Sequence, residues 1–305
     1  MRIGLSGGGA TIDRIVEQAV EAEADGFTTL WYAGAASADP LLPIAFAGRA
    51  TTTIELGTSV VQTYPVHPVQ LAQRAFAVAD AIGRPAFTLG VGPSHAPVIE
   101  GMYGLDYTHA GRHTEEYVTV LAQILHGEAV DFEGVDFRVH RGALPAPPAV
   151  PVELLVSALA PRLLRVAGAV ADGTILWMAN ATAVATHVVP RLRAAAEDAG
   201  RPSPRIVVGL PVAAHDDVEE ARRVAAEQFA VYGNLPNYQR ILAHGGLDSP
   251  ADAAIVGDEA AVTAQIKATF EAGGTDFWAA PFPVGTDRSA SRARTRALLA
   301  QLAAA

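Results

Sequence analysis

The sequence predicts a (β/α)₈ barrel, an α/β fold in which eight parallel strands alternate with helices around a closed sheet. Short, continuously apolar runs alternate with longer amphipathic stretches along the whole chain, and this alternation repeats eight times. Hydrophobic residues make up 50% of the 305 positions, which is enough to cover both faces of a parallel sheet. Because barrels of this length often fold as one unit, we expect a single domain over residues 1–305.

The expected strands are short, apolar and bounded by turn residues. In chain order they are Arg2–Ser6, Thr28–Tyr32, Ile54–Val60, Ala86–Val91, Val152–Val156, Gly173–Met178, Ile206–Val212 and Asp276–Ala280. The expected helices are Ile12–Ala24, Pro40–Ala50, Pro68–Ile82, Arg112–Leu125, Pro161–Ala169, Ala183–Ala199, Val218–Phe229, Glu259–Ala272 and Ser289–Leu302. An open doubly wound sheet remains the alternative, although Ser6-Gly7-Gly8-Gly9 is followed by no third glycine of a dinucleotide fingerprint.

Two insertions interrupt the repeat. The first, about residues 94–151, contains a Gly/Tyr-rich loop, a helix, a possible hairpin around 132–137 and the proline-rich segment 144–148. The second, about residues 230–257, contains Tyr232-Gly233-Asn234-Leu235-Pro236-Asn237-Tyr238. Long excursions from a barrel usually cover its active face, so we expect both insertions over the C-terminal ends of the strands.

Composition excludes several classes of function. With 22 basic and 32 acidic side chains the net charge is −10, which argues against nucleic acid and against an anionic membrane surface as partners. The chain has no cysteine, which excludes disulfides, iron–sulfur clusters, thiolate zinc sites and a thiol nucleophile. No apolar run reaches about 18 residues, and no signal-peptide core follows Met1. We therefore expect a cytoplasmic protein whose partners are small molecules or a second copy of itself.

The residues at the predicted C-terminal strand ends are small and neutral. They are Ser6, Ala33, Ser59, Val60, Gly92, Ser94, Ser157, Asn180, Ala213 and Pro281. A barrel glycosidase needs two carboxylates there, an enolase-type site needs acids that bind magnesium, and a Schiff-base aldolase needs a buried lysine. The only lysine, Lys267, falls inside a predicted helix, where we expect it to be solvated.

Metal and serine-hydrolase sites are also unsupported. His109 and His113 have the spacing of two ligands on one helix face, but Gly111 weakens that helix and no third ligand stands nearby, so we expect no metal. No Gly-x-Ser-x-Gly elbow is present. A mouth of small neutral residues suits a large organic cofactor that supplies the reactive atom, which indicates redox chemistry.

Several motifs occur in a specific order along nearly the whole chain. They are Leu30-Trp31, Ile54-Glu55-Leu56-Gly57-Thr58-Ser59-Val60, Tyr64-Pro65-Val66-His67-Pro68, Leu89-Gly90-Val91-Gly92-Pro93-Ser94-His95, Ala158-Leu159-Ala160-Pro161-Arg162, Ala171-Asp172-Gly173-Thr174, Ile255-Val256-Gly257-Asp258 and Ala272-Gly273-Gly274-Thr275-Asp276-Phe277. In this order and spacing they resemble the luciferase-like monooxygenase superfamily, specifically its oxidoreductases that use the deazaflavin coenzyme F420.

The resemblance implies where the cofactor binds. It places a non-prolyl cis peptide, Ser59-Val60, behind the tricyclic ring, with an ordinary buried strand as the alternative. It implies ring contacts from Gln62, Pro93 and Ser94. It also implies that the turn containing Leu159, Ala160, Arg162 and Leu163 receives the cofactor phosphate, although relatives often carry glycine where Ala160 stands.

The helix expected to begin at Pro161 supports this anion site independently. Proline is favoured at a first helical position, and the free N–H groups of Arg162, Leu163 and Leu164 would bind an anion, reinforced by the Arg162 guanidinium. The alternative is an ordinary helix start with a solvent-facing arginine.

The candidate catalytic residue is His95. The resemblance aligns it with the position of a catalytic glutamate in sugar-oxidising relatives, and an imidazole suits proton transfer near neutral pH. The alternative is a structural histidine that bonds a loop carbonyl. We expect the substrate pocket to include Tyr64, His67 and Tyr232, although His67 before Pro68 is also typical of a helix start.

One departure from the family pattern bears on the direction of the reaction. Relatives that oxidise alcohols carry Asp-His just after the tryptophan of strand two, where this chain has Gly34 and Ala35. The missing base favours a reductase, in which reduced F420 donates hydride to an electrophilic C=C, C=N or C=O bond. The alternatives are an FMN-dependent monooxygenase or reductase and a non-catalytic deazaflavin carrier or sensor. We expect a homodimer with a small-molecule hydride acceptor.

Overall fold

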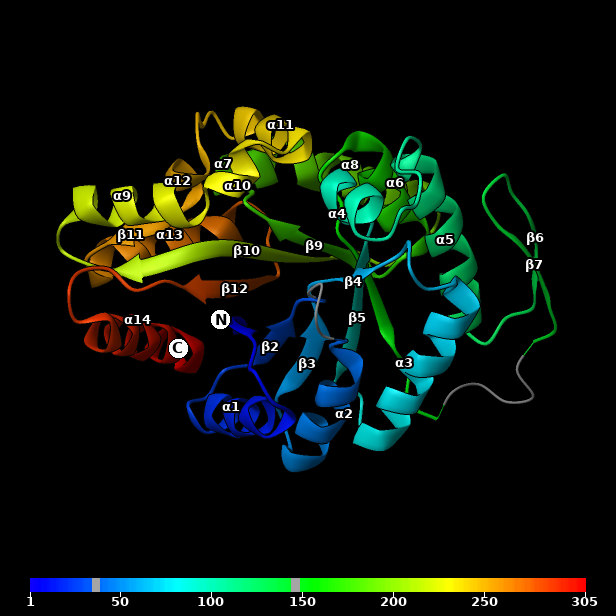
Figure 1. Ribbon diagram of the computed structural model, residues 1–305, viewed down its shortest axis with the longest axis horizontal. Coiled ribbons are helices and arrows are strands. Elements are labelled where there is room, and N and C mark those ends of the chain that lie inside the picture. The colour runs from blue at the N-terminus through cyan, green and yellow to red at the C-terminus, as the bar shows by residue number, and fades with distance from the viewer. Residues whose placement is uncertain (35–38, 144–148) are drawn as a thin grey trace.

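Eight parallel strands close into a barrel in the computed structural model, which describes residues 1–34, 39–143 and 149–305 (Figure 1). They are β1 (Ile3–Gly7), β2 (Thr29–Tyr32), β3 (Glu55–Thr58), β5 (Phe87–Gly92), β8 (Glu153–Val156), β9 (Gly173–Trp177), β10 (Arg205–Ala214) and β12 (Asp276–Pro281). Each strand pairs in parallel with the next, and β10 closes the barrel by pairing with both β9 and β12. The predicted (β/α)₈ barrel is therefore confirmed, and the open sheet is wrong.

Helices surround the sheet, as Figure 1 shows. They are α1 (Ile12–Ala24), α2 (Leu41–Ala50), α3 (Pro68–Ile82), α5 (Ala110–Leu125), α6 (Pro161–Val170), α8 (Val189–Asp198), α9 (Val218–Gln228), α13 (Glu259–Glu271) and α14 (Arg288–Ala304). Lys267 is exposed on α13, as expected. No helix in the described part of the chain has both the length and the apolar character needed to span a membrane.

The third predicted strand is divided in two. β3 ends at Thr58, the Ser59-Val60 peptide bond is cis, and β4 (Val61–Gln62) continues beyond it beside β5. The cis peptide predicted from the resemblance is confirmed, and the alternative of an uninterrupted strand is wrong.

The predicted helix 183–199 is also divided. It consists of α7 (Ala181–Ala183), the π-helix η1 (Val184–Val188) and α8. Pro190 explains the wider turn, because it has no N–H to donate and its ring would clash with the carbonyl four residues earlier in a regular helix.

The second insertion is more ordered than the sequence indicated. It forms α10 (Ala230–Gly233), α11 (Pro236–His244), α12 (Pro250–Ala253) and the strand β11 (Ile255–Gly257), which pairs with the end of β10. Three residues are too few to show a strand period, so β11 was missed.

The first insertion divides between two locations. Its helix α4 (Ala96–Gly101) and Tyr107 reach the mouth of the barrel. The predicted hairpin is confirmed as β6 (Val130–Glu133) and β7 (Arg138–Arg141), but it stands beside α5 at the flank of the molecule (Figure 1), so the expectation that it covers the active face is wrong. It is held there by Glu116 of α5, whose carboxylate accepts three N–H groups from the hairpin turn at 2.7–3.0 Å. The proline-rich segment 144–148 lies outside the described residues.

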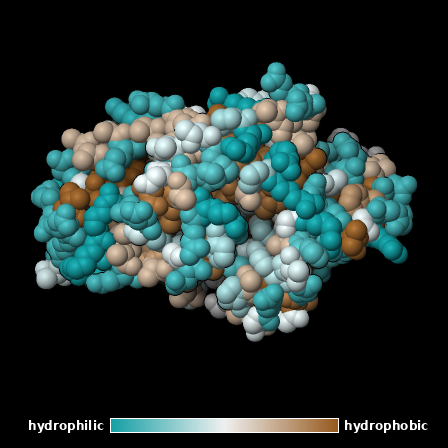
Figure 2. All heavy atoms as spheres, turned by 90° about the horizontal axis from the view of Figure 1, so that it is seen from above, coloured by the Kyte–Doolittle hydropathy of each residue, from teal (hydrophilic) through white to brown (hydrophobic). Residues whose placement is uncertain are grey.

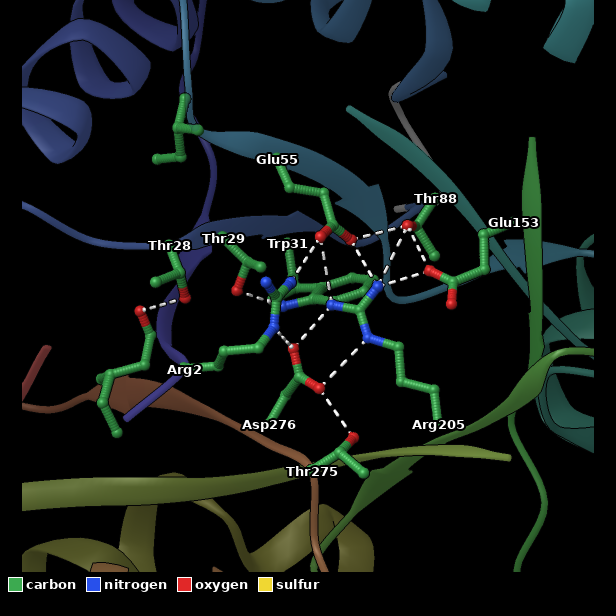
Figure 3. A network of polar contacts seen from close by, with 12 residues as sticks. Arg2, Thr28, Thr29, Trp31, Glu55, Thr88, Glu153, Arg205, Thr275 and Asp276 are labelled. Carbon is green, nitrogen blue, oxygen red and sulfur yellow. Dashed lines mark hydrogen bonds and ion pairs between the residues drawn. The ribbon is translucent and has the colours of Figure 1, made fainter. Parts of the chain in front are cut away.

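Charged residues close the N-terminal end of the barrel (Figure 3). Arg205 at the start of β10 bonds Glu55 at 2.7 Å and Asp276 at 2.6 Å, and also pairs with Glu153. Arg2 adds a bond to Asp276 at 2.7 Å. These ion pairs link the four strands β3, β8, β10 and β12 below the core.

An apolar layer lies above these charges inside the barrel. Its buried members are Trp31, Leu155, Ile175, Val207 and Trp278. Because strand side chains alternate between the two faces, Leu155, Val207 and Trp278 each lie two residues after a charged residue of the layer below, as Trp278 follows Asp276. The two layers fill the lower barrel, so the C-terminal end is where a cavity can form.

Candidate active-site cavity

A cavity of about 680 Å³ lies at the C-terminal strand ends. This volume is typical of small-molecule sites. The lining comes from strand ends, from the starts of α4, α5 and α6, and from α10 and α11. Its described members are Ser6, Gly7, Trp31, Ala33, Gly34, Ser59, Val60, Gln62, Gly92, Pro93, Ser94, His95, Val98, Tyr107, Ala110, Gly111, Ser157, Leu159, Ala160, Arg162, Leu163, Ile175, Leu176, Trp177, Phe229, Tyr232, Asn237, Tyr238, Arg240, Trp278 and Ala280. Nine predicted cofactor contacts, His95 and Tyr232 are among them.

One wall combines the cis peptide with the end of β5. Gln62 donates its side-chain N–H to Ser94 Oγ at 3.2 Å, and the Tyr107 hydroxyl donates to the Ser94 carbonyl at 2.7 Å. Ser94 has a positive φ of 63°, and these two bonds hold its backbone and side chain. A Cβ at Gly92 would lie 2.9 Å from Val60 Cγ2, so this wall depends on glycine for its close approach.

A second wall is the N-terminus of α6. Its N-cap residue, Ala160, has no side chain that could accept a hydrogen bond, and the N–H groups of Arg162 and Leu163 have no acceptor among the described residues. Leu164 differs from the prediction: its N–H donates to the Ala160 carbonyl at 3.0 Å, because it is the first donor of the regular helix. The wall thus offers two backbone donors rather than three.

The Arg162 guanidinium is already engaged. Its Nε donates to Glu115 Oε2 at 2.6 Å, and both side chains are about half exposed. The predicted reinforcement of the anion site by this guanidinium is therefore weakened, because Glu115 of α5 offsets part of its charge.

His95 lies at the N-cap of α4, with its ring centroid 5.7 Å from that of Tyr238. Burial lowers the pKa of His95 below its ordinary value. Burial also raises the pKa of Tyr107 to about 12 and that of Tyr238 further, so both phenols are neutral near pH 7. The His95 ring makes no hydrogen bond to a described residue, which is contrary to the alternative that it bonds a loop carbonyl.

Two predicted pocket residues lie elsewhere. The described lining includes neither Tyr64 nor His67. Tyr64 stacks on His113 with ring centroids 3.8 Å apart. His67 is the N-cap of α3 and accepts the Val69 N–H through Nδ1 at 3.3 Å, as the helix-start alternative indicated. Within the described residues, no group of three possible ligands that could hold a metal was found around His113 or anywhere else.

Trp177, Trp278 and Phe229, which were not predicted in the cavity, form a third wall together with the predicted Tyr232. Trp177 and Trp278 stack with centroids 5.1 Å apart and planes at 25°. Trp177 also meets Phe229 and Tyr232 edge to face. The Trp278 indole N–H is buried without an acceptor among the described residues. The signal in the sequence is the period-two alternation that points both tryptophans into the barrel, whereas the predicted site residues came mainly from the segments after each strand.

The profile of the luciferase-like monooxygenase family matches residues 2–302. The chain belongs to this family.

Individual relatives agree with the match. An F420-dependent glucose-6-phosphate dehydrogenase of Nakamurella multipartita is 28% identical over 258 residues, covering 80% of this chain and 75% of that protein. A solved F420-dependent secondary alcohol dehydrogenase, in complex with an F420–acetone adduct, has a TM-score of 0.78 at 19% identity over 97% of both chains. The FMN-bound oxygenating constituent of 3,6-diketocamphane monooxygenase from Pseudomonas putida has a TM-score of 0.73 at 21% identity, covering 99% and 97%. At these identities the two structures establish the fold.

This luciferase-like cavity carries no acidic group in its described lining. At the end of β2, Gly34 donates its N–H to the Val60 carbonyl at 3.1 Å, and a Cβ at Gly34 would lie 2.9 Å from that oxygen. The position therefore suits glycine and offers no side chain to act as a base. Ala35, which stands with Gly34 where alcohol-oxidising relatives carry Asp-His, lies outside the described residues.

Proposed function

We propose that this luciferase-like protein is a coenzyme F420-dependent oxidoreductase that acts as a reductase on an electrophilic C=C, C=N or C=O bond. The observation that carries the proposal is the cavity itself. One of its walls offers the two N–H groups at the start of α6 that have no acceptor among the described residues, and another is aromatic. Its described lining contains no carboxylate. The names of the dehydrogenases above support F420 rather than another cofactor.

The residues present fit a flat, anionic cofactor. The N–H groups of Arg162 and Leu163 would hold the phosphate, and Ser59 and Val60 would lie against the ring. Gln62, Pro93 and Ser94 line the same wall and would contact the ring edge. When bound and reduced, F420 supplies a hydride at its C5 carbon.

The side chains of the cavity support reduction rather than alcohol oxidation. Alcohol-oxidising relatives carry Asp-His after the tryptophan of strand two, and Gly34 at the first of these positions offers no such base, so proton transfer with the substrate is left to His95. His95 would hold a proton for the substrate atom that becomes anionic after hydride arrives. Tyr232 and Tyr238, from α10 and α11, would exclude water from that region.

Cofactor binding tests the proposal first. We expect the apoprotein to bind F420 tightly in a fluorescence titration and FMN much more weakly. We also expect reduced F420 to be oxidised by at least one member of a panel of enones, imines and ketones. Tight FMN binding without F420 binding would favour the FMN-dependent alternative. F420 binding without oxidation by any acceptor would favour a carrier or sensor.

Ala160 offers a matched pair of variants for the phosphate site. In Ala160→Asp the new carboxylate would cap α6 and occupy its two open donors, so the helix stays stable while a phosphate is repelled. We expect at least about tenfold weaker F420 binding, with unchanged binding of the phosphate-free deazaflavin. Ala160→Gly should bind F420 as the parent does. Equal F420 affinity in both variants would show that the phosphate binds elsewhere.

A further inference from the structure

Arg240 is the positive group of the cavity that the proposed function leaves unused. The chain carries a net charge of −10, yet the charged side chains in the described lining are Arg162 and Arg240 alone. Arg162 is paired with Glu115. Arg240 has no carboxylate within ion-pair distance among the described residues, and it donates to the neutral Oδ1 of Asn237. A guanidinium with no acidic partner in such a cavity attracts an anionic ligand group.

The helix that carries Arg240 is anchored at its far end. Asn180 donates its side-chain amide to the Gly245 carbonyl, just beyond α11, at 3.0 Å. His244, the last residue of α11, stacks on His187 with ring centroids 3.8 Å apart. On the same helix Tyr238 is buried and lines the cavity. These contacts fix the backbone of α11, so the exposed Arg240 side chain extends from a rigid support at the mouth.

Aromatic rings line the cavity beside α11. The Tyr238 and Tyr232 rings meet edge to face with their centroids 4.9 Å apart, and the centroids of Tyr232 and Trp177 are 5.8 Å apart. Aromatic walls of this kind suit planar, conjugated molecules. The region therefore combines aromatic surfaces with a cation at the mouth.

Resting on the proposed reductase function, we infer that the acceptor is a planar α,β-unsaturated carboxylic acid whose carboxylate binds Arg240. Reduction of its C=C bond adds a hydride to the β-carbon and a proton to the α-carbon. Together these equal the two hydrogens that the reduced deazaflavin loses, so no further oxidant or reductant is needed. His95 lies in the same cavity and would hold the proton.

The test compares an acid with its neutral ester. The probes are trans-cinnamate and methyl trans-cinnamate, measured by calorimetry for binding to the F420 complex and by steady-state kinetics with reduced F420. We expect Arg240→Met to weaken trans-cinnamate binding and raise its KM about tenfold, with less than about twofold change for the ester. Arg240→Lys should restore part of the acid's affinity. Arg138→Met, on the exposed hairpin, is the control and should change neither ligand.

Three results would overturn the inference. One is that the parent binds and reduces acid and ester equally well. Another is that Arg240→Met weakens both ligands to the same extent, as a purely structural role would. The third is that Arg240→Met weakens F420 binding and leaves the preference for acid over ester unchanged, which would assign Arg240 to the cofactor. In all three the protein still oxidises reduced F420, whereas failure of the proposed function would abolish that reaction in the parent.

Discussion

At Gly57 and Gly209 the lack of a side chain allows two tryptophans to fill the barrel. A Cβ at Gly57 would lie 2.3 Å from Trp31 Cζ3, and one at Gly209 would lie 2.0 Å from Trp278 Cε2. Both indoles are close to fully buried, so neither can move aside without disturbing its neighbours. These glycines therefore set the floor of the cavity.

Replacement of Gly209 tests this packing. We expect Gly209→Ala to lower the free energy of unfolding by about 1–3 kcal/mol in chemical denaturation, because the added methyl overpacks the Trp278 ring. Gly8→Ala is the control, since a Cβ there has no neighbour within 4 Å. Equal stability of the two variants would contradict the packing argument.

The protonation of His95 gives a prediction on pH dependence. Burial lowers the pKa of His95, so the imidazole is neutral at pH 7 and becomes protonated only below its ordinary value of about 6.5. If the protonated ring supplies the substrate proton, the rate of reduced-F420 oxidation should fall as pH rises through that lowered pKa. His95→Gln should flatten the profile between about pH 5 and pH 9 in stopped-flow measurements. A parallel fall in parent and variant would assign the proton to another group.

At the scale of elements, η1 connects the cofactor wall to α11. His187 of η1 is buried and lies 2.8 Å from the Leu159 carbonyl through Nε2. Since a carbonyl only accepts, Nε2 carries the proton and donates. The His187 ring also stacks on the ring of His244 in α11. His187 is therefore a positioning residue for the turn that precedes α6.

Loss of this bond should loosen the phosphate site. We expect His187→Leu to weaken F420 binding about tenfold while the phosphate-free deazaflavin binds as before, because only the turn that follows Leu159 is misplaced. His187→Gln keeps a donor near the Nε2 position and should restore most of the affinity. Fluorescence titration of both ligands measures this. A Gln variant as weak as the Leu variant would indicate a packing role instead.

Elements with strong local signals were predictable from the sequence. Helices α1 and α3 have their expected bounds, since Thr11 caps the first and Pro68 and Gly83 bound the second. Elements that depend on distant partners were not. β11 exists because β10 extends far enough to pair with it, and η1 is a rearrangement around Pro190.

In the cavity, too, features with a local sequence signal were predictable and features that depend on distant partners were not. The motifs located the turns, so the expected cofactor contacts all lie in the lining. Side-chain direction depends on packing that the sequence does not reveal. Tyr64 turns away to stack on His113, and Arg162 is drawn to Glu115 on another helix.

At the scale of the whole molecule, the two ends of the barrel have separate roles. The N-terminal end is closed by the ion network of Figure 3, in which the Arg205 guanidinium also lies 5.7 Å from the Trp31 ring. The C-terminal end holds the cavity. Seen from above, the surface of the molecule mixes polar residues with smaller apolar patches (Figure 2). Substitutions at the two ends should therefore affect different properties.

Arg205→Met tests this separation. Among the described residues, removing the guanidinium leaves Glu153 without its basic partner and Glu55 and Asp276 with Arg2 alone, so we expect the free energy of unfolding to fall by about 3–5 kcal/mol. F420 affinity of the folded protein should be unchanged. Arg138→Met, at a side chain that is 77% exposed, should change stability by less than about 0.5 kcal/mol. Loss of F420 binding in folded Arg205→Met would show that the two ends are coupled.

The most direct measurement is a crystal structure of the protein with F420 bound. We expect the phosphate oxygens to lie about 2.7–3.2 Å from the N–H groups of Arg162 and Leu163, with the ring against Ser59 and Val60. A phosphate bound away from α6, or a ring outside this cavity, would contradict the proposed function.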